Sequence, residues 1–157
     1  MFKPYLTLDH VYVSPLKPLG NGLYTLMNDY EILSSIRPAT ESRLMDELMR
    51  TLCTLNDFSS STVANRMGVN EKELNVCVHV HFGCNLIKLL RDYRHRLLFE
   101  LIIKTSLTPA EVAQRTGFAS VNCLNNYFNR VEKVRFKDVR ASHQKCTSEV
   151  NATYQIR

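Results

Sequence analysis

The sequence predicts an all-α fold in which two similar helical subdomains are joined by one long linker helix and preceded by a short arm. Its 157 residues suffice for one domain of ordinary size with a core of its own. From about residue 40 onward, apolar residues recur at helical spacing instead of alternating. A seven-residue motif also occurs twice, 49 residues apart, within the same pattern of two helices and a turn.

Residues 1–39 are expected to form a β-leaning hairpin or an extended arm. Two short β-leaning runs, HVYV and GLYTLM, are separated by PLKPLGNG, which is rich in turn-forming residues. The segment is too short for an independent core, so the sequence leaves its role open: it could dimerise, dock on a partner or be disordered.

Residues 40–84 are predicted to form the first helical subdomain, with three helices. The first helix carries an apolar stripe with four-residue spacing, made by Leu44, Leu48 and Leu52 with Met45, Met49 and Leu55 alongside. A short second helix, SSTVANRM, ends at Gly68. The third follows Asn70, a favoured N-cap, and ends at Gly83.

Residues 85–104 are predicted to form the linker helix. Its apolar stripe consists of Leu86, Leu89, Leu90, Tyr93, Leu97, Leu101 and Ile102. The second subdomain, residues 105–142, starts with a helix opened by Thr108-Pro109 and stopped by Gly117. A helix follows in SVNCLNNYFNRVEK, a short one is expected near 136–142, and residues 143–157 are expected to be a loose tail.

The internal repeat is the most informative feature. VANRMGV at residues 63–69 recurs as VAQRTGF at 112–118, with four identities in seven. Leu74 and Val78 correspond to Leu124 and Phe128 at an offset of 50, which implies one extra residue in the second turn. In each copy a small Ala permits a close helix crossing, Gly permits positive φ, and the next apolar residue fills the angle between the helices. This predicts two helix-turn-helix motifs.

Helical hairpins that merely pack against each other are the alternative explanation of one such copy. Two copies and the charge distribution favour the DNA-binding motif. Residues 43–145 contain 16 Lys and Arg against 10 Asp and Glu, whereas residues 1–42 contain three against four. A basic excess in the repeat-bearing part favours a polyanionic partner. A linker of twenty residues would be about 30 Å long, close to the ~34 Å between successive major-groove faces.

Residues 43–142 resemble the DNA-binding domain of the AraC/XylS transcription regulators. The second half carries a specific signature in AEVAQRTGFAS, residues 110–120, followed by Leu124, Phe128 and Val139-Arg140. The first half and the linker match at Val63-Ala64, Asn70, Leu74, Gly83, Arg94 and Leu101. Arg94 matches a recurrent linker Arg, interpreted as structural or facing phosphate.

Three positions depart from the family pattern. Val78 stands where an aromatic residue is usual, and Lys133 and Phe136 stand where Gly and Pro are usual, so the turn near Lys133 is expected to differ in shape. Forty residues in front of the motif cannot hold the large β-rich effector domain of many members. The resemblance therefore implies a short form without a small-molecule effector.

The second recognition helix carries an unusual row of asparagines. Asn122, Asn125, Asn126 and Asn129 share one helix face, although Asn is a poor helix former. Asn can bond adenine N6 and N7 in the major groove. The resemblance implies base reading by Val121, Asn122, Asn125 and Asn126, with Val121 on a thymine methyl. Asn129 and Arg130 are expected at phosphate. A solvated polar face without a ligand is the alternative.

In the first recognition helix, the resemblance implies contacts from Lys72, Asn75, Val76 and His79. Lys72 can reach guanine or phosphate, Asn75 can read adenine, and His79 would approach the backbone. Glu71 and Glu73 are unexpected neighbours for DNA.

The leading hypothesis is a sequence-specific bacterial transcription regulator, an activator, that binds one asymmetric double-stranded DNA site of about two helical turns. RNA polymerase is a second candidate partner. The alternative is a protein-interaction co-regulator whose first DNA-binding half has decayed, motivated by Glu71, Glu73 and the departures at Lys133 and Phe136. The sequence shows neither a Ser/His/Asp constellation nor a Gly-rich phosphate loop, so no enzyme activity is expected.

A metal site is a minority interpretation of NVCVHVHFGCN, residues 75–85. On one helix Cys77, His81 and Cys84 would share a face and could bind zinc. Gly83 should end the helix before Cys84, and Cys77 and Val78 should pack inward, so no metal or cofactor is expected. Five cysteines without CxxC favour a reducing compartment, and the N-terminus lacks a signal-peptide core. We therefore expect a cytoplasmic protein, associated with the nucleoid when bound, and no membrane partner.

Overall fold

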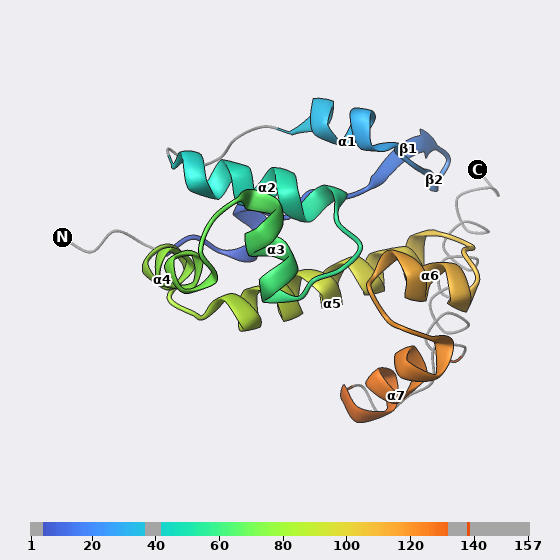
Figure 1. Cartoon of the computed structure of the whole chain (residues 1–157). Helices are drawn as coiled ribbons and strands as arrows, with labels where there is room; N and C mark the ends of the chain where they lie inside the picture. Colours follow the sequence, from blue (N-terminus) through green and yellow to red (C-terminus); the bar gives the residue numbers. More distant parts are fainter. Residues whose placement is uncertain (1–4, 37–41, 132–137, 139–157) are drawn as a thin grey trace. The chain divides into compact units, whose positions relative to one another are not determined.

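A computed structural model of the chain describes residues 5–36, 42–131 and 138 (Figure 1). The chain divides into two compact units, residues 1–97 and 98–157, and each is considered by itself. The described part is mostly helical with one small sheet, which confirms the predicted fold class. None of its helices is long and apolar enough to cross a membrane.

The elements follow one another in an order close to the predicted one. They are a 3₁₀ turn, η1 (Leu8–His10), strands β1 (Leu16–Gly20) and β2 (Leu23–Leu26), and helices α1 (Asp29–Ser35), α2 (Arg43–Thr54), α3 (Ser60–Met67), α4 (Glu71–Phe82), α5 (Leu86–Lys104), α6 (Pro109–Arg115) and α7 (Val121–Val131). The expected helix at 136–142, the tail 143–157 and the departures at Lys133 and Phe136 lie outside the described residues, apart from Asp138.

The N-terminal hairpin exists, but its first strand lies elsewhere than predicted. β1 occupies LKPLG, which composition assigned to the turn, and it pairs antiparallel with β2 across Asn21-Gly22. HVYV at residues 10–13 is not a strand, because the 3₁₀ turn ends at His10 and Val11 caps it. The Val11 side chain is fully buried. Pro18 is compatible with β1 because both strands are edges, where a missing N–H donor is tolerated.

Helix α1 was not expected in the arm. It starts at Asn28, whose side-chain oxygen accepts the Glu31 N–H at 2.8 Å, while the Glu31 carboxylate accepts the Asn28 N–H at 3.4 Å. This reciprocal cap satisfies two backbone donors that the first helical turn leaves unpaired. Lys17 of β1 lies 3.7 Å from the Glu31 carboxylate, so the hairpin and α1 are also tied to each other.

The N-terminal segment is part of the first unit's core. Tyr12 packs its ring 5.0 Å from that of Tyr93 on α5, and the Arg96 guanidinium lies 4.3 Å from the Tyr12 ring centre. Arg96 also pairs with the Asp9 carboxylate. Arg96 thus contacts the N-terminal segment twice, through the Tyr12 ring and through the Asp9 carboxylate. The segment therefore packs against α5 and is not a detached arm.

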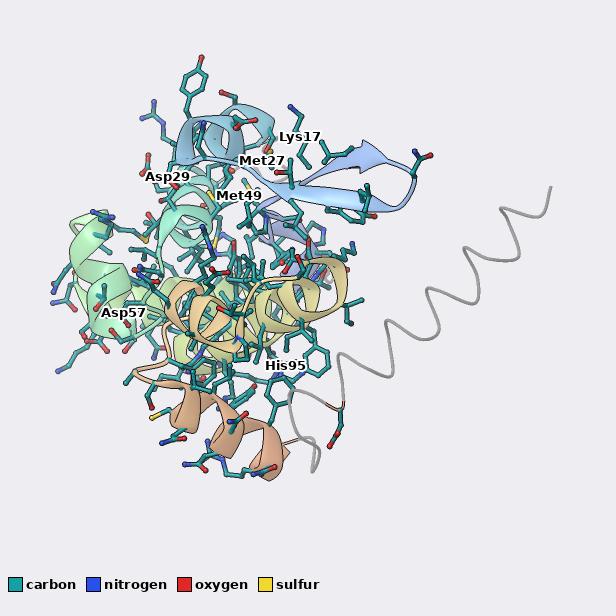
Figure 2. The ribbon with its side chains drawn as sticks, turned by 90° about the vertical axis from the view of Figure 1, so that its right-hand side faces the viewer. Lys17, Met27, Asp29, Met49, Asp57 and His95 are labelled. Carbon is teal, nitrogen blue, oxygen red and sulfur yellow. The ribbon has the colours of Figure 1, made fainter. Side chains whose placement is uncertain are left out.

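Within the first unit, α2, α3, α4 and the first part of α5 enclose a core of aliphatic and aromatic side chains. Its most deeply buried members include Met45, Leu48, Leu52, Val63, Leu74, Val78, Leu86 and Tyr93. Helix α3 is opened by Ser59, which accepts the Thr62 N–H, while Asp57 accepts the Ser59 N–H at 3.1 Å and the Thr62 hydroxyl at 3.0 Å. Asp57 is labelled in Figure 2.

The second unit has a smaller core built around the end of α5, α6 and α7. Leu98, Leu101 and Ile102 of α5, Val112 of α6 and Leu124 and Phe128 of α7 are fully buried. The rings of Phe99 and Phe128 lie 5.7 Å apart. The predicted stripe of the linker helix is confirmed, and Leu98 is an addition to it that the periodicity did not include.

Candidate nucleic-acid interface

The two repeat copies form the same turn. Gly68 and Gly117 both have left-handed φ, at 70° and 79°. In the first copy the Val69 N–H donates to the Ala64 carbonyl at 3.0 Å, and in the second the Phe118 N–H donates to the Ala113 carbonyl at 2.9 Å. This is the hydrogen bond of a Schellman helix end, which needs a residue that tolerates positive φ. The sequence predicted that both glycines permit positive φ, and the structure confirms this conformation at Gly68 and Gly117.

Each recognition helix then starts on a side-chain cap. Asn70 accepts the Lys72 N–H of α4 at 2.8 Å, and the Ser120 hydroxyl accepts the Cys123 N–H of α7 at 3.2 Å. One residue lies between Gly68 and its cap Asn70, whereas two lie between Gly117 and Ser120. The predicted extra residue of the second turn is therefore in place.

The inner faces of α4 and α7 match position by position. Leu74 and Val78 on α4 and their equivalents Leu124 and Phe128 on α7 are all fully buried. Because buried side chains lie on one side of each helix, the residues between them must face outward. The predicted contact residues can therefore be compared on the two outer faces.

The outer face of α7 is an amide face. Asn122, Asn126, Asn129 and Arg130 are exposed, and Val121 and Asn125 are half-buried beside them. Within the described residues, no hydrogen bond holds the side chains of Asn122, Asn126 or Asn129. Their amide donors and acceptors are thus available to a ligand, which is the requirement for reading the edge of a base.

The outer face of α4 is more varied. Lys72 and His79 are exposed, and Val76 is 60% exposed. Asn75 is exposed as well, but its side-chain oxygen accepts the Leu86 N–H at 2.8 Å and so caps the start of α5. Its acceptor therefore has a structural partner, unlike the asparagines of α7. Val80, 65% exposed one turn beyond Val76, belongs to the same face, and its i+4 spacing could have indicated this.

The acidic start of α4 has a structural explanation. The Ser60 hydroxyl of α3 donates to the Glu71 carboxylate at 2.5 Å, which ties the starts of α3 and α4 together. Glu71 and Glu73 both lie in the first turn of α4, where negative charge is favoured by the helix dipole. Glu71 and Glu73 can therefore be explained without assuming that the first half has lost DNA binding.

The end of α4 separates Cys84 from the other members of the histidine and cysteine cluster in residues 75–85. Gly83 has φ of 72° and ends the helix, so Cys84 lies beyond it. The His81 ring donates from Nδ1 to the Cys77 carbonyl at 2.8 Å, which fixes the ring against its own helix. Among the residues that the structure describes, no group of three or more His, Cys, Asp or Glu side chains could hold a metal ion.

The first unit also has a cavity of about 440 Å³ at its N-terminal hairpin. Lys17 and Met27 of the hairpin region and Met49 of α2 line it, and Figure 2 shows them gathered near Asp29. Charged groups on its wall already have partners: Lys17 pairs with Glu31, and Asp9 with Arg96. The lining mixes polar and apolar side chains, and its charged groups already have partners, so the outer faces of α4 and α7 remain the stronger candidate site.

Comparison with known proteins identifies a helix-turn-helix domain in this part of the chain. The sequence profile of a helix-turn-helix domain matches residues 63–142, which is just over half of the chain. No curated protein sequence matched. Similar solved structures under 25% identical indicate the fold alone.

Three such structures resemble this chain over about two thirds of its length. The DNA-binding domain of AdpA, a global transcriptional factor solved with a target DNA, is 22% identical, with 67% of this chain and 96% of that chain covered and a TM-score of 0.56. The C-terminal domain of the response regulator yesN from Fusobacterium nucleatum is 20% identical, with 63% and 99% covered and a TM-score of 0.54. That of the response regulator AraT from Geobacillus stearothermophilus is 20% identical, with 64% and 88% covered and a TM-score of 0.53.

Proposed function

Because the chain belongs to the AraC-type helix-turn-helix family of transcription regulators, we propose that it reads one asymmetric double-stranded DNA site with α4 and α7 in successive major grooves. The observation that carries this proposal is the amide face of α7. Three exposed asparagines on one face are costly for a helix and useful for hydrogen bonding to base edges. AdpA, which has a similar fold, was solved with a target DNA.

The length of α5 supports the use of two grooves by one chain. Its 19 residues correspond to about 28 Å of helix, against ~34 Å between groove faces on one side of a duplex. We propose residues 40–84 and 105–142 as the two reading subdomains and residues 85–104 as their linker. Lys72, Val76, His79, Val121, Asn122, Asn125, Asn126, Asn129 and Arg130 are the proposed contacts, with Asn75 assigned to the junction between α4 and α5.

Site selection from a random duplex pool, followed by affinity measurement, tests the proposal. We expect one preferred sequence, richer in A·T pairs in the part read by α7. In the double variant Asn122→Ala/Asn126→Ala, affinity for that sequence should fall by about 100-fold, since a good base contact contributes roughly 1–3 kcal/mol. Alanine raises helix propensity relative to asparagine, so the loss would not reflect unfolding.

Asn65→Ala is a matched control, because Asn65 is an exposed asparagine on α3, outside both recognition helices. It should bind the selected site within about twofold of the wild type. Equal affinity of the wild type for every duplex, unchanged in the double variant, would disprove sequence reading. A protein partner retained in nuclease-treated extract, together with that result, would favour the co-regulator.

The direction of control is a further part of the proposal. We propose an activator that acts in the bacterial cytoplasm and contacts RNA polymerase when bound. A reporter carrying the selected site upstream of a weak promoter should gain expression when the chain is supplied. Reduced expression from the same reporter would identify a repressor instead.

A further inference from the structure

The outer face of α4 contains two exposed valines that the proposed function leaves without a specific role. Val76 is 60% exposed and Val80 65% exposed, four residues apart on the same helix. Single exposed apolar residues are common on protein surfaces. A pair at this spacing forms a continuous apolar strip, however, and it is bordered by the exposed side chains of Lys72 and His79.

Valine lowers the stability of the helix at these two positions. A β-branched side chain loses rotamer freedom in a helix, and an exposed one recovers little of that cost by packing. On the buried side of the same helix Val78 is fully enclosed, so its valine is explained by the core. Val76 and Val80 have no such explanation, which makes an external apolar contact the natural reason for them.

We propose that α4 reads thymine, with Val76 and Val80 as the specificity-determining residues that contact the C5-methyl groups in the major groove. In that groove the thymine methyl is the apolar group that a side chain can recognise. The partner proposed for this strip is duplex DNA, because the strip is continuous with Lys72, which suits a phosphate or guanine partner. This inference rests on the proposed function and adds the base class read by the first subdomain.

The spacing of the two valines constrains the site. Residues four apart rise by about 6 Å along a helix, and base pairs are stacked at about 3.4 Å. The strip therefore spans roughly two base-pair steps. We expect two methyl contacts a few base pairs apart in the part of the site read by α4, on a groove face with A·T pairs.

Replacing thymine by deoxyuridine in the selected duplex removes only the methyl group and leaves base pairing intact. Each replaced thymine in contact with α4 should weaken binding by about threefold to fourfold, the value of one buried methyl-sized group. The variant Val76→Ala/Val80→Ala should bind thymine and deoxyuridine duplexes equally in that half, while replacements in the half read by α7 keep their effect. Alanine favours the helix, so the variant should remain folded.

Ile87→Ala is the matched control, because Ile87 is 62% exposed in the same unit but lies on α5. It should keep the full thymine preference. A selected site that tolerates deoxyuridine at every position, or a preference that persists in the double valine variant, would overturn the inference and leave the proposed function standing. A chain that binds all duplexes alike would overturn both.

Discussion

In the first helix-turn-helix, α4 exposes two valines beside charged and polar side chains, which include a lysine, a histidine and the two acids of its first turn. In the second, α7 exposes mainly asparagines and one arginine. Their inner faces are the same in kind: Leu74 corresponds to Leu124 and both are fully buried. Packing therefore constrains one side of each helix and leaves the other free. Since the fold does not require the outer residues to differ, we propose that their difference reflects what each helix binds.

The largest effect is expected at the buried leucine that occupies the same position in each recognition helix. Leu74→Ala and Leu124→Ala should each lower the free energy of unfolding of their own unit by about 3 kcal/mol, through lost burial and a residual cavity. Hydrogen exchange read by mass spectrometry separates the two units, and Val76→Ala serves as an exposed control. A loss below 1 kcal/mol at either leucine would show that the two cores are not equivalent.

The second test uses Asn75 and Asn125, which occupy corresponding positions 50 residues apart. Asn75→Ala removes the acceptor of the Leu86 N–H and should cost about 1 kcal/mol of stability, with little change in DNA affinity. Asn125→Ala should do the reverse, weakening DNA binding by about tenfold at unchanged stability.

Asn75→Asp sharpens this test, because it keeps the oxygen that accepts the Leu86 N–H. It should restore the stability that alanine loses, as followed by urea unfolding. If Asn75→Ala instead weakens DNA binding as much as Asn125→Ala, Asn75 reads a base in addition to capping α5.

The smallest expected effect concerns the acidic start of α4. Glu71→Gln keeps an acceptor for the Ser60 hydroxyl but removes a negative charge, so stability should change by less than about 0.5 kcal/mol. DNA affinity at low salt should rise by about two- to threefold, and this gain should shrink as salt is added. Glu47→Gln, exposed on α2, is the matched control. Weaker DNA binding by Glu71→Gln would contradict a purely structural role for this acid.

Much of the helical part could be predicted because its signals are local. Asn70 and Thr108 cap their helices through their own side chains, and Gly68 and Gly117 supply a backbone conformation that other residues rarely adopt. Such features depend on a few neighbouring residues, so they can be recognised without the fold.

The N-terminal region could not be predicted in the same way. Strand β1 contains Pro18 and turn residues, and composition therefore favoured a turn over the edge strand that forms. Asn28 and Glu31 did carry a capping signal for α1, which the β-leaning residues around it obscured. The contact between the Tyr12 and Tyr93 rings depends on tertiary structure alone.

In the candidate site, too, local features could be predicted from the sequence and tertiary contacts could not. The exposure of Asn122, Asn126 and Asn129 follows from helical periodicity, as expected, whereas Asn125 is half-buried. The attachment of Asn75 to Leu86 does not, because it depends on how the chain turns after Gly83. The DNA contacts themselves remain predictions.

The attachment of the N-terminal segment has a consequence for the order in which the chain can fold. Asp9 and its partner Arg96 are 87 residues apart, whereas Phe99 and Phe128 of the second unit are separated by only 29. At a synthesis rate of about 5–20 residues per second, roughly 4–17 s pass between the appearance of Asp9 and that of Arg96. Asp9 and Tyr12 therefore leave the ribosome before the α5 residues that they contact. Until α5 has been synthesised, the Tyr12 ring lacks its contact with Tyr93, and this part of the first unit cannot be completed.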